Sequence, residues 1–278
     1  MKIILSRKGF DKGNGCGVSP HIVEEGRLYS FPIPSKGNYY SYSDLRFSDE
    51  LSCGSLMRQL GFTDKACTKS CHNDPDIRKD LFYSPEPLWQ PMLGQQGNPQ
   101  KHLRKQNISE GDLFLFYGLF QDVKKLNGRY CYISNNLRHM IWGYLQVGRP
   151  PVHISGNPEG RLHPHFYAGD LYDQKDENTV YIAADHLSFA PKMSGFGVLP
   201  YHQGRVLSLN AGSVPEIYNV FSLPEFFFDI RMTGNKQEDR WRREGDRCFL
   251  RAAYPGQEFV IKDCPEAAHW AKELLTLS

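Results

Sequence analysis

Two aspartates and a histidine stand close together in the segment His72-Asn73-Asp74-Pro75-Asp76. An imidazole and two carboxylates within five residues can gather a divalent cation. Oxygen ligands suit Mg²⁺ or Mn²⁺, and the histidine widens the choice of metal. His72, Asp74 and Asp76 are therefore candidate acid, base or ligand groups, with Asp74 and Asp76 pointing the same way if the segment is extended. Because Asp-Pro is a strong turn former, an Asx turn is the alternative interpretation.

A second set of candidates follows residues 2–5, which predict a buried first strand. Arg7 and Lys8 could hold a phosphate, and Asp11 could hold a metal ion or a ribose hydroxyl, or act in catalysis. The glycine-rich residues 12–17 then let the backbone approach a ligand closely. A solvated strand end followed by a surface turn is the competing interpretation.

A third set surrounds a predicted basic helix that begins near Asn98. It follows the segment Gly94-Gln95-Gln96-Gly97, and a helix N-terminus after glycines can bind an anion. Gln96, His102 and Arg104 are therefore candidate substrate contacts. A solvated helix face would show the same residues.

Two later segments add four polar candidates. His163 and His165 share one face if they lie on a strand, where they could bind a metal or a substrate. Partly exposed polar residues in a loop are the competing interpretation. Gln257 could hydrogen-bond a base edge, and Glu258 could act as a general base or a ligand. A glutamate at the start of an exposed strand needs no such role.

Two strands are predicted at 112–120 and 139–147, and the segments GDLFLFY (111–117) and IWGYLQV (141–147) belong to this pair. This pair resembles the core of PUA-like barrels, including the EVE and ASCH domains. The resemblance implies a pocket in which aromatic side chains stack on a base that is often modified. Tyr117 and Trp142, together with Phe116, would supply that stacking.

Strand signals dominate the rest of the chain. Strands are predicted at 28–33, 129–133, 179–184, 248–253 and 258–261, and helices over 48–60 and from residue 265. Asn127-Gly128 predicts a hairpin turn, and the last helix should bury Ala267, Trp270, Ala271, Leu274 and Leu275. With no internal repeat and no linker, we expect one α+β unit over 1–278, strand-dominated, containing a PUA/EVE-like β-barrel with a few short flanking helices.

Composition narrows the class of protein. The 278 residues carry 33 Lys+Arg against 31 Asp+Glu, which excludes a histone-like basic protein but allows a local basic patch. No apolar run is long enough to span a bilayer, so no membrane partner is expected. The seven cysteines show no paired spacing, so reduced thiols and a cytoplasmic location are expected.

Taken in order, these segments resemble the family called nucleotide modification associated domain 3. The resemblance rests on MKIILSRKGFD, Ser19-Pro20, Pro32-Ile33-Pro34, HNDPD, Gly94-Gln95, His102-Leu103-Arg104, GDLFLFYGLF, IWGYLQVG, His163-Pro164-His165, Leu223-Pro224, Trp241 and GQEFV. Members of that family are encoded beside enzymes that modify bases in phage and bacterial DNA. The resemblance implies that Arg7, Asp11, His72, Asp74, Asp76, Gln257 and Glu258 serve one site. The chain departs from the family pattern at Gly15-Cys16-Gly17-Val18 and at Arg231-Met232-Thr233-Gly234, where a Tyr-His pair would be expected.

Three functions are compatible with these residues. The first is an enzyme, a hydrolase or group transferase, acting on a nucleotide or a modified base in nucleic acid, with a divalent metal such as Mg²⁺ or Mn²⁺. The second is a non-catalytic PUA/EVE-like reader of modified bases. The third is a structural partner of other proteins in a phage-defence or DNA-modification complex.

Overall fold

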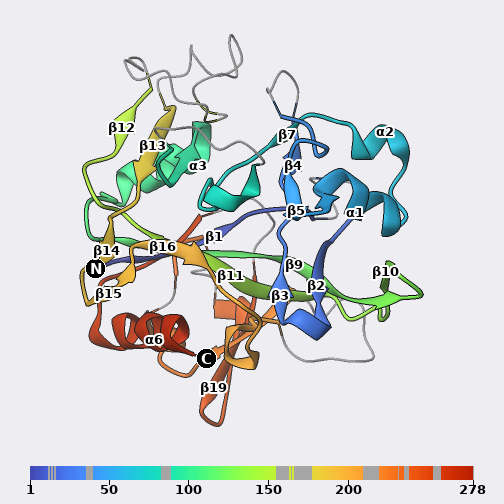
Figure 1. Cartoon of the computed structure of the whole chain (residues 1–278). Coiled ribbons are helices and arrows are strands. Elements are labelled where there is room, and N and C mark those ends of the chain that lie inside the picture. The colour runs from blue at the N-terminus through green and yellow to red at the C-terminus, as the bar shows by residue number, and fades with distance from the viewer. Residues whose placement is uncertain are drawn as a thin grey trace.

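The chain folds into layers of short strands with few helices (Figure 1). The computed structural model describes residues 1–11, 13, 15, 17–35, 40–82, 89–154, 163, 165, 177–208, 219–230, 232–234, 238–252 and 258–277. Within this part of the chain strands far outnumber helices, so the predicted strand-dominated α+β class is confirmed.

The long strand β9 (Leu113–Leu126) is the centre of the largest sheet. Its first half pairs in parallel with β1 (Ile3–Arg7) and its second half in parallel with β2 (Ser19–Ile22). On its other side it pairs antiparallel with β11 (Arg138–Gln146) and β10 (Arg129–Tyr132). The first eight residues of β9 are all buried, as expected for a strand that is covered on both faces.

The sheet has two free ends. β20 (Glu258–Ile261) pairs antiparallel with β1 at one end, and β16 (Phe196–Val198) pairs antiparallel with β11 at the other. β3 (Arg27–Leu28) extends the sheet beside β2. Since the order β16-β11-β9-β1-β20 does not return on itself among the described strands, the sheet is open there and the predicted PUA/EVE-like barrel is not confirmed.

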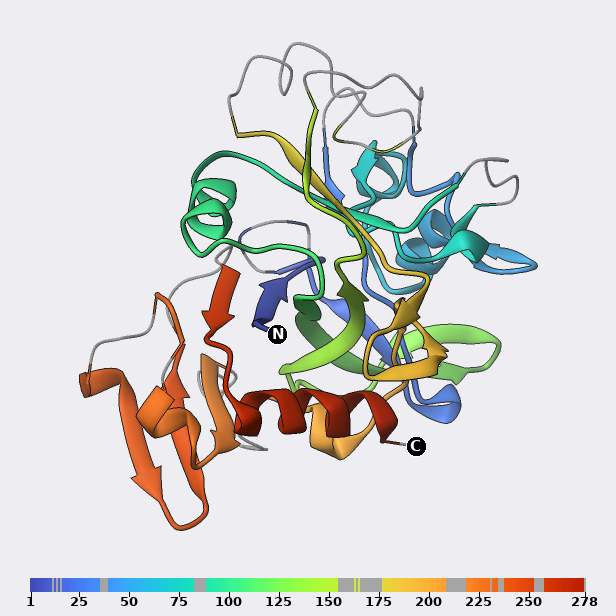
Figure 2. The ribbon, with the colours of Figure 1, turned by 90° about the vertical axis from the view of Figure 1, so that its left-hand side faces the viewer.

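Side chains of the central strands alternate between two apolar cores. Ile3 and Leu5 face one core, and Ile4 faces the other. The helix α6 (Pro265–Thr276) covers the first core, as Figure 2 shows along the lower side of the sheet. Its predicted apolar face is confirmed, because Ala267, Trp270, Ala271, Leu274 and Leu275 are all buried.

The second face is covered by elements that also reach the candidate site. β8 (Met92–Gln95) forms a smaller sheet with β13 (Thr179–Ile182) and β12 (Val152–His153). Nearby, β4 (Ile33–Pro34) pairs antiparallel with β7 (Cys71–His72).

The remaining α-helices and strands of the described chain are β5 (Arg46–Ser48), β6 (Leu51–Ser52), α1 (Cys53–Gln59), α2 (Asp64–Cys67), α3 (Gly97–Lys105), β14 (His186–Leu187), β15 (Ala190–Ser194), β17 (Val220–Pro224), α5 (Phe227–Ile230), β18 (Trp241–Glu244) and β19 (Arg247–Arg251).

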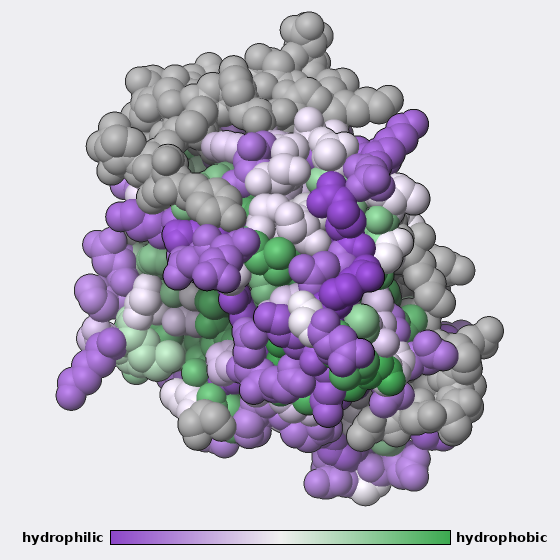
Figure 3. Space-filling view, turned by 45° about the vertical axis from the view of Figure 1, so that its right-hand side comes forward, coloured by the Kyte–Doolittle hydropathy of each residue, from purple (hydrophilic) through white to green (hydrophobic). Residues whose placement is uncertain are grey.

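Among the coloured residues on the face drawn in Figure 3, most are hydrophilic and the hydrophobic ones appear in smaller areas between them. Within the described residues, none of the helices combines the length and the apolar character that crossing a bilayer requires.

Candidate functional site

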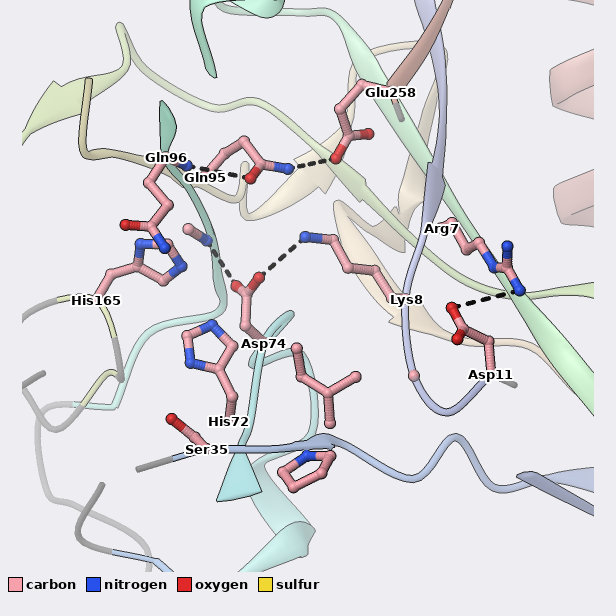
Figure 4. Close-up of a pocket in the computed structure, with 14 residues that line it drawn as sticks. Arg7, Lys8, Asp11, Ser35, His72, Asp74, Gln95, Gln96, His165 and Glu258 are labelled. Carbon is pink, nitrogen blue, oxygen red and sulfur yellow. Dashed lines mark hydrogen bonds and ion pairs between the residues drawn. The ribbon is translucent and has the colours of Figure 1, made fainter. Parts of the chain in front are cut away.

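A cavity of about 230 Å³ opens where the ends of β1, β7 and β8 meet the start of β20. Several of the predicted site residues line it, namely Arg7, Lys8, Asp11, His72, Asp74, Gln96, His165 and Glu258 (Figure 4). These side chains come from segments that are far apart in the sequence. The first strand end, the HNDPD segment and the start of β20 therefore meet in a single cleft.

A buried ion pair crosses the middle of the cavity. Lys8 Nζ lies 3.0 Å from Asp74 Oδ2, and the backbone N–H of Gly94 donates to Asp74 Oδ1 at 2.6 Å. His163 Nε2 lies 3.4 Å from the same Oδ1. Burial alone would raise the pKa of the Asp74 carboxyl, but Lys8 and His163 hold it well below its usual range. Burial would likewise lower the pKa of Lys8, but the charges of Asp74 and Glu258 raise it, so that both groups are ionised.

Two imidazoles stand beside this carboxylate. One donor atom from each of His72, Asp74 and His165 lies within 4.8 Å of the other two. The rings of His72 and His165 meet edge to face, with centroids 5.0 Å apart. Such a group of two nitrogen donors and one oxygen donor is a candidate metal centre.

Both imidazoles are neutral at physiological pH. Burial lowers the pKa of His72 to about 3 and that of His165 to about 4, and the charges of neighbouring groups do not reverse this. The amide of Asn178 also fixes the tautomer of His165. Its Nδ2 donates to the backbone carbonyl of His165 at 3.2 Å, so its oxygen is the atom that lies 2.8 Å from Nδ1. Nδ1 therefore carries the proton, and Nε2 carries the lone pair with which His165 could bind an ion.

Glu258 forms the opposite wall of the cavity, where only 4% of its surface is exposed. Its Oε1 accepts hydrogen bonds from Ser6 Oγ at 3.0 Å and from Gln95 Nε2 at 2.5 Å. Its Oε2 is buried and has no hydrogen-bond partner among the described residues. Burial raises the pKa of Glu258, and Lys8, Ser6 and Gln95 offset this only in part. A carboxyl in this setting can take up or release a proton near neutral pH more readily than an exposed one.

Arg7 points away from Lys8, as expected for neighbours at a strand end (Figure 4). Its Nη2 lies 3.4 Å from Asp11 Oδ2, while the other oxygen of Asp11 accepts from the backbone N–H of Gly13 at 2.6 Å. Asp11 therefore ties Arg7 and the glycine-rich loop together at the rim of the cavity. Its contacts with the Arg7 cation and the Gly13 amide give Asp11 a structural role beside its candidate catalytic one.

Asp76 does not line the cavity. Its Oδ2 accepts from the indole N–H of Trp89 at 3.0 Å, and its backbone pairs with Met92. Residues 73–75 lie outside any strand, so the alternation that would align Asp76 with Asp74 does not hold. The two aspartates therefore occupy different environments.

The predicted basic helix also lies outside the cavity. His102 Nε2 is 2.8 Å from Thr233 Oγ1, and Arg104 is largely exposed and pairs with Glu177 at 2.6 Å. Gln257 lies outside the described residues.

The aromatic candidates are core residues. Tyr117 packs edge-on against Phe221 in the core beneath α6, and Trp142 packs against Phe116 in the core on the opposite face of the sheet. Tyr117 is 3% exposed and Trp142 is 5% exposed, and neither lines the cavity. Tyr117 lies on one face of the sheet, and Phe116 and Trp142 lie on the other. The three rings therefore do not form one stacking surface.

Four residues that hold the site in place were not among the individual site residues predicted from the sequence. Ser6 and Gln95 hold Glu258, Gly94 holds Asp74, and Asn178 holds His165. Ser6 and Gln95 are each next to a predicted site residue in the sequence, and this adjacency could have identified them. Asn178 carries no local signal, because its role arises only when β13 comes to lie beside His165.

A family model described as nucleotide modification associated domain 3 matches residues 2–262. Neither a curated protein nor a solved structure matches the chain.

Proposed function

The chain belongs to the nucleotide modification associated domain 3 family, and on this premise we propose that it is an enzyme that acts on a nucleotide or on a base of a nucleic acid. The cavity of Figure 4 is the proposed active site. One observation carries this proposal. Lys8, Asp74 and Glu258 are brought together in a single buried cleft from segments far apart in the sequence. Buried ionisable groups are costly to fold unless paired, and they cluster where chemistry is done.

Glu258 is the proposed general acid or base. Hydrogen bonds from Ser6 and Gln95 hold one of its oxygens, and the other is buried without a partner among the described residues. Because Glu258 lines the cavity, its carboxyl group is the proposed partner for proton exchange with a bound substrate. Arg7 and Lys8, at the end of β1, supply positive charge for an anionic group such as a phosphate.

The size of the cavity limits what it can enclose. At about 230 Å³ it is smaller than the roughly 300–1,000 Å³ of pockets that hold drug-sized ligands. It therefore suits one ring, a nucleobase or a sugar, with the remainder of the substrate outside. Ile33 and Pro34 provide an apolar wall, and Gln96 contributes a polar side chain that could hydrogen-bond a base edge.

The lining favours an enzyme over a reader of modified bases. Among the described residues that line the cavity, none is Phe, Tyr or Trp. A module that holds a base without chemistry usually stacks it on such rings.

A conversion assay tests the proposal. Purified protein is incubated with a panel of nucleoside monophosphates and triphosphates and with oligonucleotides carrying modified bases, and products are identified by mass spectrometry. We expect at least one compound to be converted, and Glu258→Gln to lower the rate at least 100-fold, within the range of general acid–base catalysis. Glu177→Gln is the matched control, because Glu177 is also buried but pairs with Arg104 outside the cavity.

Two results would overturn it. In the first, no member of the panel is converted, while modified DNA binds equally well to wild-type protein and to Glu258→Gln, which is the behaviour of a reader. In the second, conversion occurs but Glu258→Gln is as active as Glu177→Gln.

A further inference from the structure

We propose that His72, Asp74 and His165 bind one divalent ion of the first transition series, such as Mn²⁺, Fe²⁺, Co²⁺ or Zn²⁺. Their donor atoms lie within 4.8 Å of one another. Ligand atoms about 2.1 Å from a shared ion are roughly 3–4 Å apart, so small side-chain movements bring the three donors to one ion.

The donor set selects the class of metal. Mg²⁺ and Ca²⁺ prefer shells made of oxygen, whereas imidazole nitrogen suits first-row transition ions. Two of the three donors here are imidazoles. Asp76 is not part of this donor group, because it does not line the cavity and its Oδ2 accepts from Trp89. The ion is therefore of a different class from the one that a pair of aspartates would take.

The residues around the donors hold them in place. Asn178 orients His165 through two hydrogen bonds, and the Gly94 amide fixes Asp74. Metal sites commonly show such a supporting shell of hydrogen bonds. All three donor residues line the cavity, so coordination positions that they leave open would be accessible to water or substrate.

The charge of Lys8 provides a specific test of the proposed metal site. Its ammonium lies 3.0 Å from Asp74 Oδ2, so it now supplies the positive charge that an ion would supply. Lys8 and a divalent ion bound by the same carboxylate would repel each other. Removing the charge of Lys8 should therefore strengthen metal binding. If the residues serve only to form the buried ion pair of Lys8 with Asp74, the same change would destabilise the site and would not increase metal affinity.

The test measures metal binding to the full chain without substrate. After removal of metals with a chelator, Co²⁺ and Mn²⁺ are titrated and followed by visible absorption and by electron paramagnetic resonance. We expect one ion per chain, with a nitrogen hyperfine signal from imidazole in the Mn²⁺-loaded wild-type protein, and no displacement by millimolar Mg²⁺. This spectroscopic readout needs no variant, so it does not depend on any variant folding.

Variants then identify the donors. His72→Ala, Asp74→Asn and His165→Ala should each weaken binding at least tenfold, and Lys8→Met should strengthen it severalfold. Asp76→Asn and His102→Ala are the matched controls and should bind as wild type, because both residues are bonded outside the cavity. The proposal is overturned if wild-type protein takes up no ion, if the bound ion shows no nitrogen coupling, or if Asp76→Asn weakens binding as much as Asp74→Asn.

As a cofactor for catalysis the ion rests on the proposed function, but its binding does not. Glu258→Gln should bind the ion normally even if it abolishes conversion. Failure of metal binding with conversion intact would therefore reject only this inference, and failure of conversion with metal bound would reject only the proposed function.

Discussion

Gly94 lies so close to His165 that a Cβ atom on Gly94 would be 2.0 Å from Cδ2 of the imidazole. Real Cβ atoms do not approach other atoms so closely, so the ring occupies the space that any other residue at this position would fill. The same glycine donates its backbone N–H to Asp74. One residue of β8 thus positions both an imidazole and a carboxylate of the proposed metal site.

Gly94→Ala should therefore impair the site more than the fold. We expect the new methyl group to displace His165 and to weaken Co²⁺ binding about tenfold or more. The free energy of unfolding should fall by about 1–3 kcal/mol, as for other overpacking substitutions. Co²⁺ titration and urea unfolding of the same protein measure both quantities.

Gly26→Ala is the control for this prediction. Its Cβ would meet nothing within 4 Å, although its φ of +60° strains an alanine. It should lose about 1–2 kcal/mol of stability and bind Co²⁺ as wild type. Equal metal affinity in both alanine variants would contradict the proposed role of Gly94.

Local sequence patterns predicted those parts of the fold that local chemistry determines. The apolar residues 113–120 form the buried strand, and the Asn127-Gly128 turn joins β9 to β10 with both φ angles positive, at 49° and 80°. Two-residue hairpin turns of this kind require residues that tolerate positive φ. Barrel closure depends on which distant strands pair, and the open order of the described sheet was beyond the reach of local patterns.

The candidate site likewise contains residues that the local sequence predicts and residues that it does not. Lys8 and Asp74 were found because charged residues at segment ends are conspicuous in a sequence. Asp76 appeared equivalent to Asp74 only under the assumption of a straight strand, and the irregular backbone of residues 73–75 removes that equivalence. The partnership of Asn178 with His165 depends on tertiary packing alone.

Glu258→Gln should stabilise the protein at neutral pH. Burial raises the pKa of Glu258 in the folded state above its usual range, so the folded protein favours the protonated form. A raised carboxyl pKa contributes stability below the unfolded value of about 4.3, and this contribution is lost as pH rises through the folded value. Glutamine resembles the protonated form at every pH. We therefore expect the variant to melt at a higher temperature than wild type at pH 7.5, and the difference to vanish near pH 4.

Calorimetry over this pH range measures the effect, with Glu177→Gln as the control. A melting temperature of Glu258→Gln below that of wild type at pH 7.5 would show that the charge of Glu258 is favourable in the folded state. The carboxylate would then be held as part of an ion pair with Lys8.

Asp122→Asn should destabilise the protein at neutral pH and progressively less in acid. Asp122 Oδ1 lies 2.7 Å from His21 Nδ1 and also accepts a hydrogen bond from Arg138. Although burial alone would raise the pKa of Asp122, these two partners lower it. A lowered pKa adds stability above the unfolded value of about 3.9, and this stability is lost as pH falls through the folded value. We expect Asp122→Asn to cost about 1 kcal/mol at pH 7, and clearly less at pH 3.

Urea unfolding at several pH values measures this difference. Asp49→Asn is the matched control, because Asp49 also pairs with an arginine, Arg46, but its side chain is 95% exposed. It should change stability by less than about 0.5 kcal/mol. A cost for Asp122→Asn that stays constant between pH 7 and pH 3 would contradict the assignment.

Trp142→Leu should damage the core and spare the site. Trp142 packs against Phe116, is 5% exposed and lies outside the lining of the proposed active site. Loss of its ring volume should cost about 2–3 kcal/mol of the free energy of unfolding. The folded fraction should still bind and convert the compound identified in the panel assay, with wild-type affinity by fluorescence anisotropy. If a base instead stacks on Trp142, leucine would weaken binding by about 1–3 kcal/mol. Such a loss, in protein shown to be folded, would support a reader that stacks a base on aromatic rings. Its ligand would then bind on the Trp142 face of the sheet, opposite Tyr117.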